Sequence, residues 1–115
     1  MFKEIYLHLK QSGIDVYSIG QHKGLCERPY VVISETGDSD ILGKNLMNKN
    51  VELLIYYPLN SYSEFEGYIE KIKRSMKELS HIRRVIENNP KIIDDDKKAY
   101  MTSFTYKKIK TKEGA

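Results

Sequence analysis

Apolar residues at the start of the chain recur at helical spacing and then change to alternation. The first stripe consists of Phe2, Ile5, Tyr6 and Leu9. This spacing predicts an amphipathic helix that turns one side toward a core. Gly13 ends the predicted helix, because glycine readily adopts the left-handed conformation that closes helix C-termini. Residues 14–19 alternate between apolar and polar, which predicts a half-buried strand.

Two apolar runs rich in β-branched and aromatic residues follow. Residues 28–34 begin with Arg28-Pro29 and continue as Tyr-Val-Val-Ile-Ser, and residues 51–57 end at Pro58. β-branched and aromatic residues favour strands, so both runs are predicted strands. Pro29 fits this assignment, because proline is tolerated at the first position of a strand, where a missing backbone donor costs little.

The segment 35–50 between these two strands is rich in residues that favour turns. They are Gly37, Asp38, Ser39, Asp40, Gly43, Asn45, Asn48 and Asn50. The segment is about three times longer than an ordinary hairpin connection, and loops of this length in small domains are commonly functional. We predict a loop that projects as a hairpin arm.

A second helix is predicted from Ser61 to Leu79. Ser61 and Glu64 have the spacing of a capping box, as do Ser63 and Glu66. The apolar stripe of this helix consists of Phe65, Ile69, Ile72, Met76 and Leu79. Its intervals of four and three favour a helix packed on a sheet over a coiled coil, which would need more heptads.

Short apolar runs around residues 82–86 and 92–93 are separated by Asn88-Asn89-Pro90, which predicts two short strands around a turn. Alternation in residues 100–109 predicts a last strand with one aromatic face. The predicted fold is therefore α+β: a mostly antiparallel sheet, with one long helix and the N-terminal helix packed on one face and the other face half polar. Residues 1–110 are predicted to form a single domain and 111–115 a flexible C-terminal tail.

The composition excludes some classes of protein but does not identify a function. The 115 residues are 40% hydrophobic and 30% charged, with a net charge of +3 and one cysteine, Cys26. These proportions are those of a folded globular domain, and no apolar run reaches the roughly 20 residues of a membrane-spanning helix. No secretory signal pattern is present at the start, so we expect a cytoplasmic protein that makes no membrane contact and has no internal disulfide.

The residues that could carry chemistry are scattered. His22-x-x-x-Cys26 is too little for a zinc site, and as a catalytic pair it has only Glu27 nearby to orient it. Asp38-x-Asp40 lacks the later ligands of a calcium loop, and no phosphate-binding glycine motif or hydrolase elbow occurs. We therefore expect no enzyme, no cofactor and no metal site.

Two features favour contact with other molecules. The chain has nine tyrosines, a residue favoured at interfaces, and Tyr56 and Tyr57 must lie on opposite faces of one strand. At least one of these two side chains is thus expected to face away from the core. Lys107, Lys108 and Lys110 give the last strand a basic bias, which suits either a solvated strand edge that discourages aggregation or contact with DNA or an acidic partner.

The order of these segments, with the run Arg28-Pro29-Tyr30-Val31-Val32-Ile33, the strand from Val51 and the helix from Ser61, resembles the tail terminator or tail-completion proteins of long-tailed bacteriophages and prophages. The resemblance covers nearly the whole chain. It implies a non-enzymatic α+β subunit of a hexameric ring that caps the tail tube and joins the tail to the head.

Under this resemblance the expected partners are further copies of the chain in a homo-hexamer, a tail tube protein and a head-completion or connector protein. The expected location is the bacterial host cytoplasm during assembly and then the virion tail. Candidate subunit contacts lie in the loop 35–50 and on the strands: Asp38, Asp40, Lys44, Asn48, Tyr56, Tyr100 and Tyr106. Lys107, Lys108 and Lys110 are candidates for contact with DNA in the ring lumen or with a partner protein. The alternatives are a small cytoplasmic binding or regulatory module and an enzyme that uses Cys26 with His22.

Overall fold

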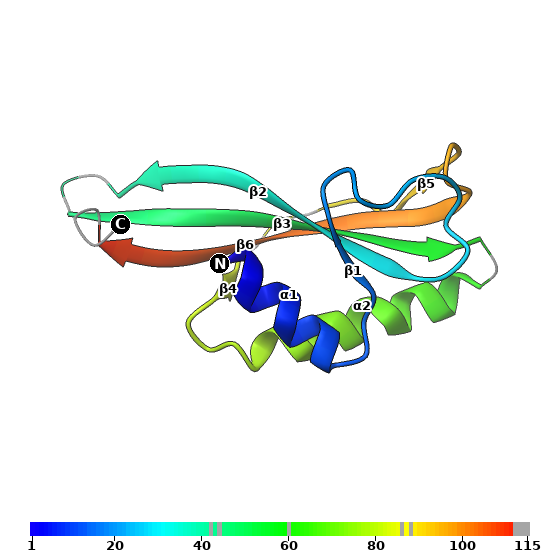
Figure 1. Ribbon diagram of the computed structural model, residues 1–115, viewed down its shortest axis with the longest axis horizontal. Helices are drawn as coiled ribbons and strands as arrows, with labels where there is room; N and C mark the ends of the chain where they lie inside the picture. The colour runs from blue at the N-terminus through cyan, green and yellow to red at the C-terminus, as the bar shows by residue number, and fades with distance from the viewer. Residues whose placement is uncertain (42, 44, 60, 86, 88, 112–115) are drawn as a thin grey trace.

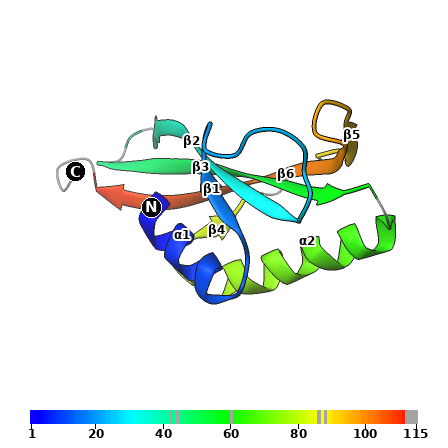
Figure 2. The same ribbon diagram turned by 45° about the vertical axis from the view of Figure 1, so that its right-hand side comes forward.

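The structure, a computed structural model, describes residues 1–41, 43, 45–59, 61–85, 87 and 89–111. Two helices lie on one side of a six-stranded sheet (Figure 1; Figure 2), which confirms the α+β fold class. The elements in chain order are α1 (Phe2–Gln11), β1 (Val16–Ser18), β2 (Tyr30–Asp40), β3 (Leu46–Pro58), α2 (Tyr62–Lys77), β4 (Arg83–Arg84), β5 (Ile92–Asp94) and β6 (Ala99–Thr111).

The strand order is β1-β2-β3-β6-β4, with β5 also paired to β6. β1 runs parallel to β2, and every other pair is antiparallel, so the sheet is mostly antiparallel as predicted. β4 pairs with β6 at Tyr106 and Lys107, whereas β5 pairs with it at residues 99–101. The two short strands expected around residues 82–86 and 92–93 are present as β4 and β5, and each uses β6 as its partner.

The main core lies between the sheet and the helices. From α2 it contains Phe65, Ile69, Ile72 and Met76, each at most 2% exposed, which confirms the predicted stripe. Ser61 caps this helix as predicted, since its hydroxyl accepts a hydrogen bond from the backbone N–H of Glu64 at 3.4 Å. The helix ends at Lys77, two residues before the predicted end.

A second, smaller cluster covers part of the other face of the sheet. It consists of Cys26, Tyr30, Tyr56 and Ala99. The connection between β1 and β2 crosses this face, and the backbone N–H of Cys26 donates to the carbonyl of Lys97 at 2.8 Å. This face is therefore covered at one end, where the sequence pattern predicted it to be half polar. Tyr56 does point away from the helices, but it is buried in this cluster.

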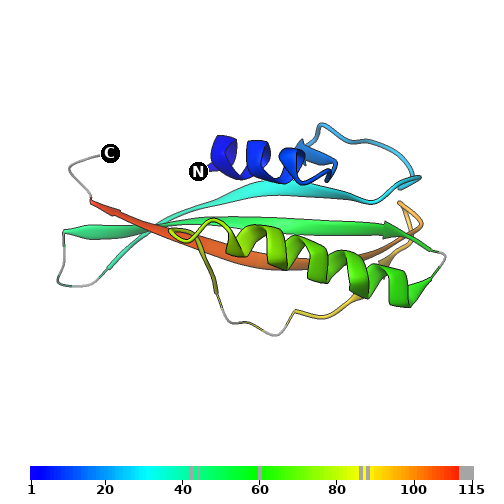
Figure 3. The ribbon, with the colours of Figure 1, turned by 90° about the horizontal axis from the view of Figure 1, so that it is seen from below.

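Beyond the helices, β2, β3 and β6 continue as a three-stranded extension, visible at the left in Figure 1 and Figure 3. The extension makes the molecule elongated, with extents of 48 × 26 × 25 Å. The prediction of a loop over residues 35–50 is thus wrong in its secondary structure, because β2 continues to Asp40 and β3 already begins at Leu46. The prediction that the segment projects as a hairpin is confirmed.

The C-terminal boundary also differs slightly from the prediction. β6 includes Thr111, the first residue of the expected tail, and residues 112–115 lie outside the described part of the chain. Among the described helices, neither is long and apolar enough to cross a membrane.

Candidate assembly interface

The three-stranded extension, called the arm below, comprises residues 34–40 of β2, 46–52 of β3 and 105–111 of β6. Its base contains a β-bulge in β2, where the register with β3 shifts between Glu35 and Gly37. Gly37 has a φ of +101°, which disfavours any residue with a side chain. Bulges increase the local twist of a strand, so this one sets the direction in which the arm leaves the body.

Strand register places charged residues in rows across the arm. One row runs from Asp38 on β2 through Lys49 on β3 to Lys108 on β6, and the next runs from Asp40 through Met47 to Lys110. Both rows begin with an aspartate at the β2 edge and end with a lysine at the β6 edge. The arm therefore has an acidic margin and a basic margin.

Both margins have open backbone edges within the described residues. β1 pairs with β2 only at residues 31–33, so residues 34–39 have a strand neighbour on one side alone. β4 pairs with β6 only at residues 106–107, which leaves residues 108–111 in the same condition. An open edge presents unpaired N–H and C=O groups and is a template for another strand.

Side chains reinforce the difference between the two edges. Glu35, Asp38 and Asp40 are exposed on the β2 side. On the β6 side Lys107 and Lys108 are half-buried, and Ile109 is an exposed apolar residue, 54% accessible. The β6 edge thus combines basic charge with exposed apolar surface, a combination suited to an acidic strand.

An ion pair joins the base of the arm to the N-terminal helix. The Glu4 carboxylate of α1 forms an ion pair with Lys108, whose Nζ lies 3.6 Å from Glu4 Oε1, and it also contacts the ring of His81. Burial acts to raise the pKa of Glu4, but the hydrogen bond from His81 and the charge of Lys108 outweigh it and leave the pKa below its usual value. Lys108 therefore already has an ionic partner within its own chain. Lys107 has no ion pair among the described residues.

The residues predicted from sequence to make subunit contacts differ in how exposed they are. Tyr56 is 7% exposed and Tyr106 is 3% exposed; both belong to hydrophobic clusters of this chain, so their nomination as subunit contacts needs correction. Tyr100 is half-buried and stacks on Phe65 with ring centroids 5.4 Å apart. Asn48 lies on the arm, and its side-chain oxygen is buried with no hydrogen-bond partner among the described residues. Lys44 and the side chain of Lys110 lie outside the described residues.

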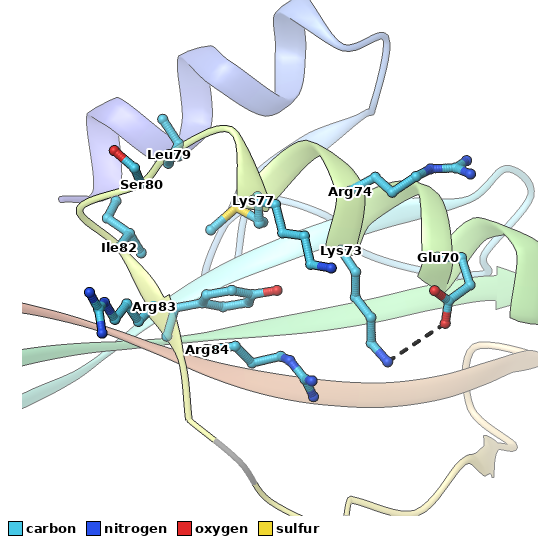
Figure 4. Close-up of a pocket in the computed structure, with 11 residues that line it drawn as sticks. Glu70, Lys73, Arg74, Lys77, Leu79, Ser80, Ile82, Arg83 and Arg84 are labelled. Carbon is cyan, nitrogen blue, oxygen red and sulfur yellow. Dashed lines mark ion pairs between the residues drawn. The ribbon is translucent and has the colours of Figure 1, made fainter.

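A basic groove that sequence reasoning missed lies beside the arm's base, between α2 and β4. It has a volume of about 500 Å³ and is lined by basic residues of both elements and by Tyr106 of β6. Figure 4 shows Lys73, Lys77 and Arg84 reaching into one space. The lysines followed a helical pattern that indicated only a solvated face, and Arg84 is brought to them by tertiary pairing.

His22 and Cys26 have a packing role. The His22 ring stacks on Tyr30 with centroids 3.9 Å apart, and the Cys26 thiol donates to the carbonyl oxygen of Arg28 at 3.3 Å. Burial raises the pKa of Cys26 to about 11, which keeps the thiol protonated near neutral pH, whereas nucleophilic attack requires the thiolate. The described residues also contain no group of three acidic, histidine or cysteine side chains able to hold a metal ion.

No protein-family model and no curated protein matches the chain.

Proposed function

We propose that this chain is the subunit of a head-to-tail ring of the tail terminator type, in which the arm joins neighbouring copies. The observation that carries the proposal is the opposite charge of the arm's two open edges. Glu35, Asp38 and Asp40 follow one edge, and Lys107, Lys108 and Lys110 follow the other.

Charge on an edge strand has two possible uses, and the signs distinguish them. Charges protect an edge against aggregation because they are costly to bury and repel an edge of the same sign, and edges of opposite sign additionally allow attraction between two different edges. Here the β2 edge of one copy attracts the β6 edge of another. The sheet can therefore continue from copy to copy, with backbone hydrogen bonds supplying affinity and the charges selecting the orientation.

Two different surface patches meet in this contact, so the interface is heterologous. Such interfaces produce a closed ring when the rotation between neighbours closes and a filament when it does not. The strong twist of paired strands gives each added copy a fixed rotation relative to the last. A ring of six copies is the assembly that the resemblance to tail terminators implies.

The remaining parts of the proposal follow from this assignment. The partners are further copies of the chain, a tail tube protein and a head-completion or connector protein, and the location is the bacterial host cytoplasm followed by the virion tail. The chain acts by assembly and needs no catalytic site or cofactor. Nonspecific contact between the ring lumen and DNA belongs to the same proposal.

Native mass measured against protein concentration tests the proposal. Wild-type chain should form a ring, with hexamer as the expected species, and the variant Asp38→Lys/Asp40→Lys should remain monomeric. Asp95→Lys/Asp96→Lys makes the same change of charge on the exposed β5–β6 turn at the far end of the sheet, so it is the matched control and should assemble. A wild-type chain that stays monomeric both alone and with a tail tube end would refute the assignment.

A further inference from the structure

The groove between α2 and β4 gathers more positive charge than its surroundings balance. Lys73, Arg74, Lys77, Arg83 and Arg84 line it, and Glu70 is the single acidic residue of the lining. Glu70 contacts Lys73 at 3.7 Å, and both side chains remain partly accessible. Like charges held close together repel one another, so this arrangement favours the binding of an anion.

Three of these cations share one space. In Figure 4 the side chains of Lys73, Lys77 and Arg84 approach one another, while Arg74 and Arg83 point away in different directions. Phe104 helps to hold two of the three, because Lys73 Nζ lies 4.7 Å and Arg84 Cζ 5.8 Å from the centre of its ring. A cation fixed in this way loses little freedom when it binds a ligand.

Tyr106 adds a hydroxyl group to the lining of the groove. The residue as a whole is 3% exposed. Burial raises the pKa of Tyr106 to about 12, opposed by the charge of Arg84, so the hydroxyl keeps its proton near neutral pH and can donate it.

The donor set indicates the chemistry of the anion. A guanidinium, two ammonium groups and one neutral hydroxyl are the donors with which proteins commonly surround the oxygens of a phosphate group. A single carboxylate has two oxygens and would leave part of this set unused.

We propose that the groove between α2 and β4 binds a phosphate group, with Lys73, Lys77 and Arg84 neutralising it and the Tyr106 hydroxyl donating one hydrogen bond. A nucleic-acid backbone and a free phosphate compound present the same chemistry, and both can be offered to the full chain. This site is independent of the ring, because it uses none of the residues assigned to the arm's contact.

The test offers two probes to the wild-type chain at low ionic strength. Inorganic pyrophosphate is titrated while the backbone amide signals of Arg83, Arg84 and Tyr106 are followed by NMR, and a short fluorescein-labelled DNA duplex is titrated by fluorescence anisotropy. We expect saturable shifts at these amides. Lys77→Gln/Arg84→Gln should weaken the binding by about tenfold or more, since charge-assisted contacts are lost. Tyr106→Phe should weaken it by about fivefold.

Lys3→Gln/Lys71→Gln is the matched control, because it removes the same charge from exposed positions that do not line the groove. Its affinity should remain within about twofold of wild type after screening is considered. The unliganded Lys77→Gln/Arg84→Gln chain should melt close to wild type, because the relief of repulsion offsets the lost contact of Arg84 with Phe104; this excludes misfolding as the cause of weaker binding.

The two probes distinguish the source of the phosphate. Saturable duplex binding that Lys77→Gln/Arg84→Gln weakens supports a nucleic-acid backbone site, and amide shifts with pyrophosphate but no duplex binding support a site for a free phosphate compound. The proposal is overturned if pyrophosphate moves none of these amides and the duplex anisotropy does not change, or if Lys77→Gln/Arg84→Gln binds as tightly as the control.

Discussion

Asp38 on β2 and Lys108 on β6 stand at the two ends of one cross-strand row, with Lys49 of β3 between them. The row therefore has a negative end and a positive end, each next to an open strand edge. Surface charges of this kind contribute little to the stability of one chain, but they orient two chains that meet. This arrangement supports the proposal that the arm makes contact between copies.

Removal of the arm's end should separate assembly from folding. Deletion of residues 38–48 takes away no residue of either buried cluster, whose nearest member on β3 is Val51. We expect a chain with cooperative urea unfolding and unchanged helical circular dichroism, but with a monomeric native mass. A ring of normal size from this deletion would show that the contact lies elsewhere.

The Tyr30 hydroxyl should be dispensable. It is buried with no hydrogen-bond partner among the described residues, and an unpaired buried hydroxyl costs about 1–3 kcal/mol. Tyr30→Phe is expected to leave the free energy of unfolding unchanged or to raise it by about 1 kcal/mol.

Tyr57→Phe is the matched control for that measurement, because the Tyr57 hydroxyl donates to Glu64 at 3.1 Å. Loss of this bond should lower the free energy of unfolding by about 0.5–1.5 kcal/mol. Destabilisation of equal size in both variants would mean that the Tyr30 hydroxyl has a partner in solution, such as a bound water.

His22 should make the fold less stable in mild acid. Burial lowers its pKa from the usual 6.5, with a further contribution from the charge of Lys97 and an opposing one from Glu27. The unfolded chain then binds more protons than the folded chain below pH 6.5, so the free energy of unfolding falls as the pH drops through that value toward the folded-state pKa.

His22→Phe keeps a ring against Tyr30 but cannot be protonated. Urea unfolding at about pH 7.5 and about pH 5.5 should show a larger loss of stability for wild type than for this variant. The other titrating groups are common to both chains and cancel in the comparison. An equal pH dependence in both chains would show that His22 does not cause the loss of stability in mild acid.

The cap of α2 gives a local test of the fold. Ser61→Ala removes the hydroxyl that accepts from the Glu64 N–H, and we expect a loss of about 1 kcal/mol in the free energy of unfolding. Lys71→Ala, inside the helix at an exposed position, should change it by less than about 0.5 kcal/mol. A reversed order would contradict the capping assignment.

Local patterns predicted the elements whose signals lie within a few residues. The capping spacing of Ser61 and Glu64 and the stripe from Phe65 to Met76 were sufficient for α2. The arm was predicted as a loop because its glycines, aspartates and asparagines favour turns in isolation. Pairing of β3 with β6, which runs from Leu46↔Thr111 to Pro58↔Ala99, makes these residues strand. Such non-local pairing overrides local preference and cannot be seen in a short window of sequence.

The candidate sites, like the fold, depend partly on local sequence and partly on non-local pairing. The acidic residues of the arm and the basic residues of β6 were nominated from sequence, but their placement on opposite edges depends on strand order. Tyr106 was nominated for the surface, yet it lies 3% exposed at the groove. Lys77 and Arg84 come from α2 and β4, and no local spacing connects them.

The measurement that tests the central claim most directly mixes two arm variants. Asp38→Lys/Asp40→Lys has two basic edges, and Lys107→Glu/Lys110→Glu has two acidic edges while sparing Lys108, which pairs with Glu4 at 3.6 Å. Native mass spectrometry should find each variant monomeric alone, and an equimolar mixture should form rings in which the two alternate. Rings formed by either variant alone, or a mixture that stays monomeric while the wild-type chain assembles, would contradict the head-to-tail pairing of the arm's edges.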